Sequence, residues 1–272
     1  PITLVVLFYI FLRKKFIKSK NFNIPIICIG NIYLGGTGKT PSSIFLAKEL
    51  QKLNKNPVII RKYYNNHIDE HKLIKENFKN LIIENDREKG IRKAEELNYD
   101  SVILDDGFQD YKIKKNLNII CFNQNQLAGN GFVLPSGPLR ESLNSLKRAN
   151  IVLINGKKDK NFESKIFQIN ESLEIFYSKF IPKNLDILKG KKLLALAAIG
   201  NPDNFFNTLM DYNLKIYKKK IFPDHYVFTK SEIESIKKEA EDNDCDIVMT
   251  EKDYFKVKDF NLDNIRYLKV SL

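Results

Sequence analysis

The stretch IGNIYLGGTGKTP occupies residues 29–41, between an apolar run at 24–29 and a segment at 40–53 whose leucines have helical spacing. A strand, a glycine-rich loop and a helix in this order are the context of a phosphate-binding loop. Glycines let the backbone curl so that its N–H groups point at phosphate oxygens, and the N-terminus of the helix adds a partial positive charge. We therefore predict that a nucleotide binds at Gly35, Gly36, Thr37, Gly38, Lys39 and Thr40.

Two residues of this loop carry specific chemistry. Lys39 can reach the β- and γ-phosphates, and the hydroxyl of Thr40 can ligate Mg²⁺. The general pattern G-x-x-x-x-G-K-[ST] places a glycine at position 33, but this chain has Tyr33 there, and its nearest earlier glycine is Gly30. A glycine-rich turn with a chance Lys-Thr pair is the alternative interpretation. The strand–loop–helix context favours phosphate binding.

A second apolar run, at 101–104, ends in Asp105 and Asp106. Parallel sheets present ligands at the carboxyl ends of their strands, so these carboxylates are expected near the loop. Either can hold Mg²⁺ as the acid of a nucleotide-binding sheet does. An acidic strand end is common by itself, and its pairing with the loop is what indicates a metal site.

Short runs rich in Ile and Val alternate with helix-like segments along the chain. Strands are expected at 24–29, 57–60, 81–84, 101–104, 117–122 and 150–154, and helices at 40–53, 70–78 and 86–98. Strands that are apolar on both faces and alternate with helices predict an α/β fold with a P-loop NTPase-like parallel sheet.

The pattern restarts after about residue 180, beyond a linker at 180–190. Further strands are expected at 192–199, 245–249 and 265–270, and helices at 202–212 and 230–241. We therefore predict a P-loop domain at 21–180 and a second, smaller α/β domain at 181–272.

The first twenty residues form a separate segment. An apolar stretch, PITLVVLFYIFL, is followed by Arg13, Lys14, Lys15, Lys18 and Lys20. The stretch is shorter than the roughly 20 residues that span a bilayer and lacks a signal-peptide cleavage site. It can be the end of a membrane helix, an interfacial anchor or a buried first helix. Basic residues after an apolar segment favour membrane association for residues 1–20, and because the chain begins at Pro1, we expect residues to be missing before it.

The net charge and the cysteine spacing limit the kinds of partner, metal site and disulfide that the chain can have. The formal net charge of +12 favours nucleic acid, a phosphorylated substrate or an acidic membrane, although enrichment in Lys, Asn and Ile throughout is an alternative cause. The three cysteines are isolated from one another, which indicates neither a disulfide framework nor a zinc site. The chain lacks the aromatic-interleaved basic motifs of common RNA-binding folds, so we expect no nucleic acid partner.

Several motifs together resemble the tetraacyldisaccharide 4'-kinase family of lipid A biosynthesis, whose phosphate loop also lacks the usual first glycine. The matching segments are GNIYLGGTGKTP (30–41), DDGFQ (105–109), GNGFVLPSGPLRE (129–141), AAIGNPDNFF (197–206), FPDHYVF (222–228) and MTEKDYFKV (249–257). The resemblance implies an ATP- and Mg²⁺-dependent kinase that phosphorylates the 4'-hydroxyl of a tetraacylated glucosamine disaccharide 1-phosphate. It also implies two α/β domains with a cleft between them, and a membrane-associated enzyme at the cytoplasmic face of the inner membrane of a Gram-negative-type bacterium. We expect a monomer that contacts the lipid substrate and an anionic membrane surface.

The resemblance also implies roles for residues outside the phosphate loop. Asp69, in Ile68-Asp69-Glu70, corresponds to the catalytic base, and His225 would pair with it from the second domain. Together with Lys39 of the phosphate loop, these two residues form the expected catalytic set. A carboxylate steered by an imidazole can orient and deprotonate a hydroxyl. The glycine of the family's Gly-Asp-Glu segment is replaced here by Ile68, which weakens this match.

Three further residues are candidates to steady the phosphates: Arg87, Arg140 and Glu141. Arg140 could fork onto phosphate oxygens, with a surface ion pair as the alternative. Asp110 stands where the family usually has His.

Two other classes of protein remain. One is a P-loop NTPase, a GTPase or ATPase switch with another acceptor or partner, because Asn155-Gly-Lys-Lys-Asp159 superficially resembles the guanine-reading motif N-K-x-D; it is one residue too long. The other is a basic nucleic-acid-binding module. Competition of GTP against ATP would test the first, and salt-dependent binding of oligonucleotides would test the second.

Overall fold

The computed structural model describes residues 2–64, 67–260 and 263–272. The chain divides into two compact units, one of Pro1–Tyr63 and Asn77–Lys179 and one of Tyr64–Glu76 and Phe180–Leu272. The second unit therefore begins beside the expected linker. It also includes Tyr64–Glu76, which lies inside the range expected for the P-loop domain, so the ranges 21–180 and 181–272 do not follow the units at this segment.

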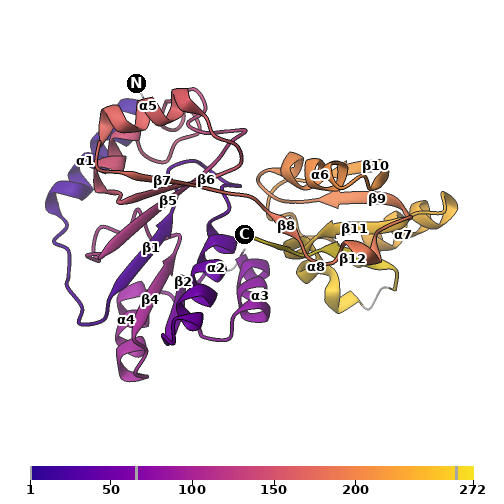
Figure 1. Ribbon diagram of the computed structural model, residues 1–272, viewed down its shortest axis with the longest axis horizontal. Coiled ribbons are helices and arrows are strands. Elements are labelled where there is room, and N and C mark those ends of the chain that lie inside the picture. The colour runs from indigo at the N-terminus through magenta and orange to yellow at the C-terminus, as the bar shows by residue number, and fades with distance from the viewer. Residues whose placement is uncertain (1, 65–66, 261–262) are drawn as a thin grey trace. The chain divides into compact units, whose positions relative to one another are not determined.

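The first unit is built on a seven-stranded sheet in the order β3-β2-β4-β1-β5-β6-β7 (Figure 1). All six neighbouring pairs are parallel. The strands are β1 (Ile26–Gly30), β2 (Pro57–Lys62), β3 (Leu81–Glu84), β4 (Ser101–Asp105), β5 (Leu117–Asn123), β6 (Ile151–Asn155) and β7 (Glu174–Ser178). The predicted α/β class with a parallel sheet is confirmed.

The register in which the strands pair brings the carboxyl ends of the central strands together. Ile29 of β1 pairs with Asp105 of β4, and Asn123 of β5 pairs with Asn155 of β6. In a parallel sheet these ends share one edge, where ligands are bound. The phosphate loop, which follows β1, therefore leaves the sheet beside the acidic end of β4.

Helices cover both faces of this sheet. Alternate strand residues such as Ile26 and Cys28 form a buried cluster with α4 (Arg87–Glu96), α5 (Lys160–Ile169) and the 3₁₀ helix η2 (Leu143–Arg148). The helix α2 (Lys39–Lys52) contacts β1, β2 and β4. Burial on both faces explains why these strands are almost continuously apolar.

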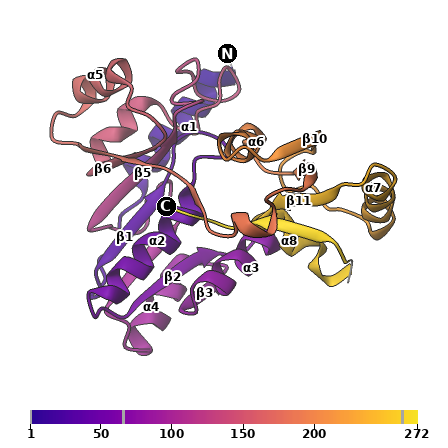
Figure 2. The same cartoon turned by 45° about the vertical axis from the view of Figure 1, so that its right-hand side comes forward.

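The second unit repeats this architecture on a smaller scale. Its parallel sheet has the order β10-β9-β11-β12. Leu193, Ala195 and Ala197 of β9 belong to one buried cluster, and the intervening Leu194 and Leu196 belong to another. Figure 2 shows α6 and α7 on either side of this sheet. The elements are β8 (Ile181–Pro182), β9 (Lys192–Ala197), α6 (Pro202–Asp211), β10 (Lys215–Ile221), α7 (Lys230–Asp242), β11 (Asp246–Thr250), α8 (Glu251–Val257), β12 (Ile265–Leu268) and β13 (Val270–Ser271), with α3 (Ile68–Asn77) beginning in the 64–76 segment.

Several of these elements have no counterpart among the expected ones, among them α5, β7, β8, β10 and α8. β10, with sequence KIYKKKI, is an edge strand in which no residue is buried. Lysines on an edge strand discourage pairing with other chains, and they remove the apolar signal by which a strand is recognised. The short α8 lies directly after β11, so no loop composition marks its start.

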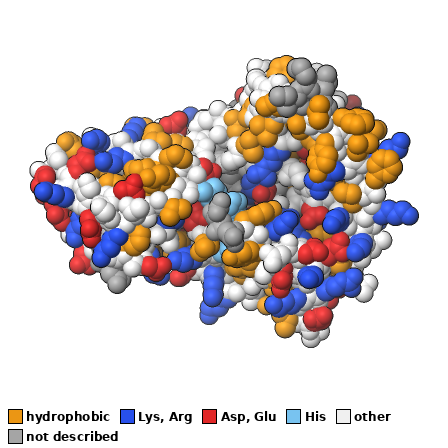
Figure 3. Space-filling model, turned by 180° about the vertical axis from the view of Figure 1, so that it is seen from behind, with side chains coloured by type: hydrophobic (Ala, Val, Ile, Leu, Met, Phe, Trp, Pro, Cys, Tyr) orange, Lys and Arg blue, Asp and Glu red, His pale blue; other side chains and the backbone are white. Residues whose placement is uncertain are grey.

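The N-terminal helix α1 (Ile2–Phe16) has no buried residue among its described side chains. The alternative of a buried first helix is therefore wrong. Val5, Phe8, Tyr9 and Phe11 are each more than half exposed. Figure 3 shows hydrophobic side chains gathered at the upper right of that view, over the first unit. None of the helices in the described ranges is both long and apolar enough to cross a membrane.

Gly30 ends β1 at a place where no side chain fits. A Cβ at this position would lie 2.5 Å from the Cβ of Phe108, which follows the Asp105–Asp106 pair. We expect Gly30→Ala to lower the free energy of unfolding by about 1–3 kcal/mol, because overpacking forces backbone shifts. Denaturant unfolding would measure this. Lys55→Ala at an exposed turn is the control, and an unchanged midpoint for Gly30→Ala would contradict the expected clash.

Candidate active site

The phosphate loop has the backbone that its glycines predict. Gly35, Gly36 and Gly38 have φ angles of 75°, 45° and 84°, in the left-handed region that favours glycine. Gly38 caps α2 without a side-chain hydrogen bond, so no side chain of the cap occupies the N–H groups of the first turn. Tyr33 lies outside the curled part and forms a β-bridge with Leu139, which explains why position 33 needs no glycine. The loop is thus shaped to bind an anion at the start of α2.

Three buried asparagines hold the loop from the ends of neighbouring strands. The side-chain amide of Asn155 donates to the carbonyl of Thr37 at 2.6 Å, and that of Asn123 donates to the carbonyl of Gly36 at 3.3 Å. Asn31 donates to the hydroxyl of Thr37 at 2.9 Å. These residues were not among the predicted site residues. The sequence signal that marks them is a polar side chain at the carboxyl end of an apolar strand, and the same signal marks Asp105.

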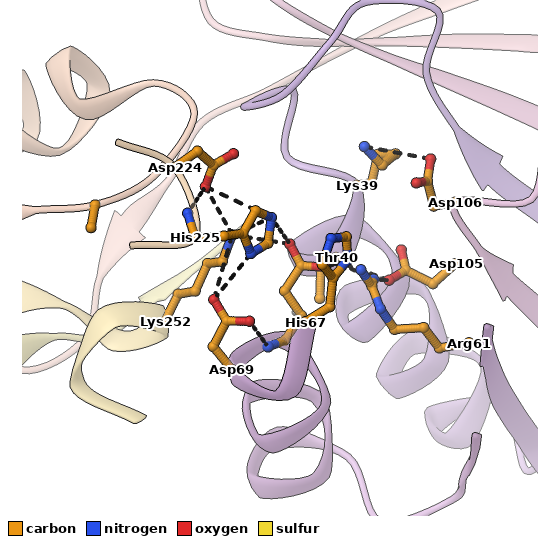
Figure 4. Close-up of polar contacts among 12 residues, drawn as sticks. Lys39, Thr40, Arg61, His67, Asp69, Asp105, Asp106, Asp224, His225 and Lys252 are labelled. Carbon is orange, nitrogen blue, oxygen red and sulfur yellow. Dashed lines mark hydrogen bonds and ion pairs between the residues drawn. The ribbon is translucent and has the colours of Figure 1, made fainter. Parts of the chain in front are cut away.

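Asp105 is fully buried and surrounded by protein donors. It accepts hydrogen bonds from the hydroxyls of Thr40, at 3.1 Å, and Ser43, at 2.9 Å. It also forms an ion pair with Arg61, the last but one residue of β2 (Figure 4). The guanidinium of Arg61 reaches Thr40 as well, at 3.3 Å. Arg61 was missed as a site residue, because nothing in the sequence shows that β2 lies next to β4.

Asp106 is more accessible and faces two cations. Its Oδ1 lies 3.6 Å from Nζ of Lys39 and 3.0 Å from Nη1 of Arg140. Burial raises the pKa of Asp106, but the charges of Lys39, Arg140 and Arg61 outweigh this and hold the pKa well below its usual range. Burial lowers the pKa of Lys39, and Asp106 opposes that shift. The two residues therefore stabilise each other's charged forms.

The remaining phosphate candidates separate into two groups. Arg87 donates to the backbone carbonyl of Asp106 at 2.7 Å and lies 3.4 Å from Asp110. Asp110, in place of the family's usual His, therefore pairs with Arg87 beside the acidic pair. Glu141 is buried and pairs instead with Lys14 of α1, at 2.8 Å, and Arg148, at 2.7 Å. The described contacts of Glu141 therefore link α1 to the rest of the first unit.

A second cluster lies within the second unit. Nδ1 of His225 is 3.5 Å from Oδ2 of Asp69, and both atoms are buried without a hydrogen-bond partner among the described residues (Figure 4). Nζ atoms of Lys252 and Lys256 each lie 3.7 Å from the same Oδ2. Burial raises the pKa of Asp69, but the facing imidazole and the two lysine charges outweigh it, so the pKa lies below its ordinary value. The carboxylate is therefore ionised at neutral pH.

The turn before α3 adds a second imidazole to this cluster. The ring of His67 stacks on that of His225, with centroids 4.2 Å apart and planes 5° from parallel. His67, Glu70 and His225 offer ligand atoms within 4.8 Å of one another. Because the rings are nearly parallel, their in-plane lone pairs do not converge on one ion, so this group does not form a metal site as arranged.

A set of oxygen donors suited to Mg²⁺ is present in the first unit instead. The hydroxyl of Thr40 touches the carboxylate of Asp105, and the carboxylate of Asp106 follows in the chain. Magnesium prefers carboxylate and hydroxyl oxygens. The donor types at Thr40, Asp105 and Asp106 therefore fit the ion that a nucleotide-binding loop requires.

A parallel sheet, a glycine-rich loop running into α2 and an acid on the adjacent strand define a P-loop nucleotide-binding fold. The profile of the tetraacyldisaccharide-1-P 4'-kinase family matches residues 2–272, and the chain belongs to that family.

Relatives and a solved structure agree with this assignment. The chain is 39% identical over 261 residues to a tetraacyldisaccharide 4'-kinase of Pelagibacter ubique, covering 94% of this chain and 82% of that protein. It is 34% identical over 292 residues to one from Rickettsia canadensis, covering 100% and 87%. A crystal structure of the "apo" form of LpxK from Aquifex aeolicus, in complex with ATP, superposes with a TM-score of 0.71 at 25% identity, covering 99% of this chain and 92% of that one.

Proposed function

We propose that this protein transfers the γ-phosphoryl group of ATP to the 4'-hydroxyl of a tetraacylated glucosamine disaccharide 1-phosphate in lipid A biosynthesis. The family match over residues 2–272 carries this proposal. The ATP in the related crystal structure and the anion-shaped loop at 35–40 support the nucleotide. The relatives are themselves named as kinases of this class.

The first unit binds and activates the donor. The N–H groups of the loop and Nζ of Lys39 hold the β- and γ-phosphates, while Arg140 is placed beside Asp106 to meet charge that develops on the transferred group. Thr40, Asp105 and Asp106 would hold Mg²⁺, which neutralises phosphate charge when bound. Asn31, Asn123 and Asn155 keep the loop preorganised.

The acceptor is activated by the second cluster. The ionised carboxylate of Asp69 accepts the proton of the 4'-hydroxyl while the oxygen of that hydroxyl attacks the γ-phosphorus of ATP. His225 orients the carboxylate. The pair can act in this way because Asp69 is held in the basic, unprotonated form at neutral pH.

Transfer of labelled phosphate tests the proposal. The assay supplies Mg·ATP labelled at the γ-position and a tetraacyl disaccharide 1-phosphate in detergent micelles. Label in the lipid supports the kinase. Release of free phosphate without labelled lipid would indicate the alternative, a P-loop NTPase with another acceptor or partner.

We also propose that α1 associates with the cytoplasmic face of the inner membrane. Its exposed apolar residues are followed by Lys15 and Lys18, which can attract anionic headgroups at roughly 1 kcal/mol each near the surface. Insertion of the apolar side chains would hold the enzyme beside its lipid substrate.

Vesicle binding gives a direct prediction. Phe11 is 56% exposed on α1, and burying such a side chain in lipid contributes about 1.5–3 kcal/mol. Phe11→Ser should therefore weaken binding to vesicles with anionic lipid by roughly tenfold or more. Phe167→Ser on α5, at a residue 39% exposed, is the matched control. Equal losses for the two variants would argue against insertion of α1.

A further inference from the structure

The motif MTEKDYFKV at residues 249–257 matched the family, but the proposed function assigns it no role. In the second unit it forms the end of β11 and the helix α8. Thr250 caps α8 by accepting from the N–H of Asp253. The fully buried Asp253 accepts from the N–H of Ala198 at 2.9 Å and pairs with Lys256 at 2.8 Å. These contacts tie α8 to Ala198, which directly follows β9, and fix the rotation of the helix.

The fixed rotation directs two lysines toward Asp69. Lys252 and Lys256 are four residues apart, so they lie on one face of the helix. Each Nζ is 3.7 Å from Oδ2 of Asp69. Their side chains are only 15% and 10% exposed, so water screens these charges less than at the surface.

Lys252 also joins the other groups of the cluster. Its Nζ lies 3.1 Å from Glu70, which neighbours Asp69 on α3, and 3.2 Å from Asp224, which neighbours His225. It is 3.5 Å from Nε2 of His225 itself. One side chain of α8 thus contacts both the helix that carries the carboxylate and the loop that carries the imidazole.

We propose that Lys252 is a positioning residue for phosphoryl transfer, because it holds Asp69 and His225 in contact. The proposal rests on the proposed function, in which Asp69 accepts the proton of the sugar hydroxyl. The backbone of His225 has a φ of 59°, a conformation that is uncommon for a residue other than glycine.

The charges around Asp69 explain why Lys256 alone does not suffice. Lys256 has Asp253 as its nearer partner, at 2.8 Å, and donates to the carbonyl of Ala198 at 3.1 Å. Facing Asp69 are therefore Lys252 and Lys256 from α8, Asp224 and His225 from the loop, and His67 and Glu70 from the α3 segment. Removing Lys252 leaves Asp69 beside Glu70 and Asp224 with less positive charge, which disfavours the ionised form of Asp69.

The test compares Lys252→Met with Lys252→Arg in the lipid phosphorylation assay. We expect Lys252→Met to lower kcat about 10- to 100-fold, because loss of alignment at the reacting atoms costs rate without weakening nucleotide binding. The KM for Mg·ATP should stay unchanged. Lys252→Arg, which keeps the charge, should recover part of the loss.

The pH profile separates positioning of the base from a merely structural role. The acid limb of kcat/KM reports the base of the free enzyme. The Lys252 charge lowers the pKa of Asp69, so its removal should move the acid limb of Lys252→Met to higher pH than in the wild type. Lys258→Met is the matched control, since Lys258 is 49% exposed and pairs with Glu76.

The outcomes distinguish a failure of the proposed function from a failure of the role of Lys252. A wild type that labels no lipid would overturn the proposed function. An active wild type together with a Lys252→Met variant of unchanged kcat and pH profile would overturn the role of Lys252 alone. If Lys252→Met does not fold, Lys252→Gln, which removes the charge but stays polar, gives the same comparison of kcat and pH profile.

Discussion

Lys39→Ala is expected to lower transfer of phosphate to the lipid by about 100- to 1,000-fold, the loss that follows removal of one preorganised donor from a transition state. Lys39 lies at the start of α2 and is only 13% exposed, with Asp106 as its ion-pair partner. Asp106 keeps Arg140 as a partner in the variant, so the fold should survive. The lost rate therefore reflects lost stabilisation of phosphate charge.

Steady-state kinetics with Mg·ATP and a thermal unfolding curve measure the two effects separately. Lys52→Ala is the matched control, because Lys52 belongs to the same helix but is exposed and pairs with Glu49. Wild-type turnover in the Lys39→Ala variant would rule out a phosphate-binding role for the loop.

Asp69→Asn should lower kcat by about 100- to 10,000-fold, the usual contribution of a general base. The amide is nearly isosteric but cannot accept the proton of the hydroxyl. His225→Ala should cause a smaller loss, because Asp69 keeps Lys252 and Lys256 as partners. The double variant should be little slower than Asp69→Asn, since residues that act as a unit are not additive.

The acid limb of the pH profile should move in a definite direction in these variants. His225 lowers the pKa of Asp69, so His225→Ala should raise it and move the acid limb of kcat/KM to higher pH. In the wild type, the pKa of Asp69 lies below its ordinary value, so we expect the acid limb at lower pH than in these variants. Additive losses in the double variant, with no shift of the limb, would show that His225 and Asp69 act independently.

The positions of the loop at 35–40 and of the acids at 105–106 were predictable because the signals that mark them are adjacent in the chain. Glycines with left-handed backbone, a following helix and a preceding apolar strand are all adjacent in the chain. The parallel sheet was predictable for a similar reason, since burial on both faces leaves apolar runs in the sequence.

Residues that support the loop were not predictable in this way. The pairing of Arg61 with Asp105 requires that β2 lie beside β4, although β3 follows β2 in the chain. The asparagine contacts from β5 and β6 depend on the register of strands far apart in sequence. Glu141 follows Arg140 directly, yet Arg140 pairs with Asp106 and Glu141 with Lys14.

The sequence by itself determined the α/β class, the nucleotide loop and the family, because each is encoded in contiguous residues whose types have one dominant use. Only the tertiary structure decided that Tyr64–Glu76 belongs with the second unit, and that two lysines of α8 join the expected pair of Asp69 and His225. The physical reason is that ion pairs act over a few ångströms in space. Sequence patterns report only the neighbours along the chain, so a cluster assembled from three distant segments leaves no periodicity to detect.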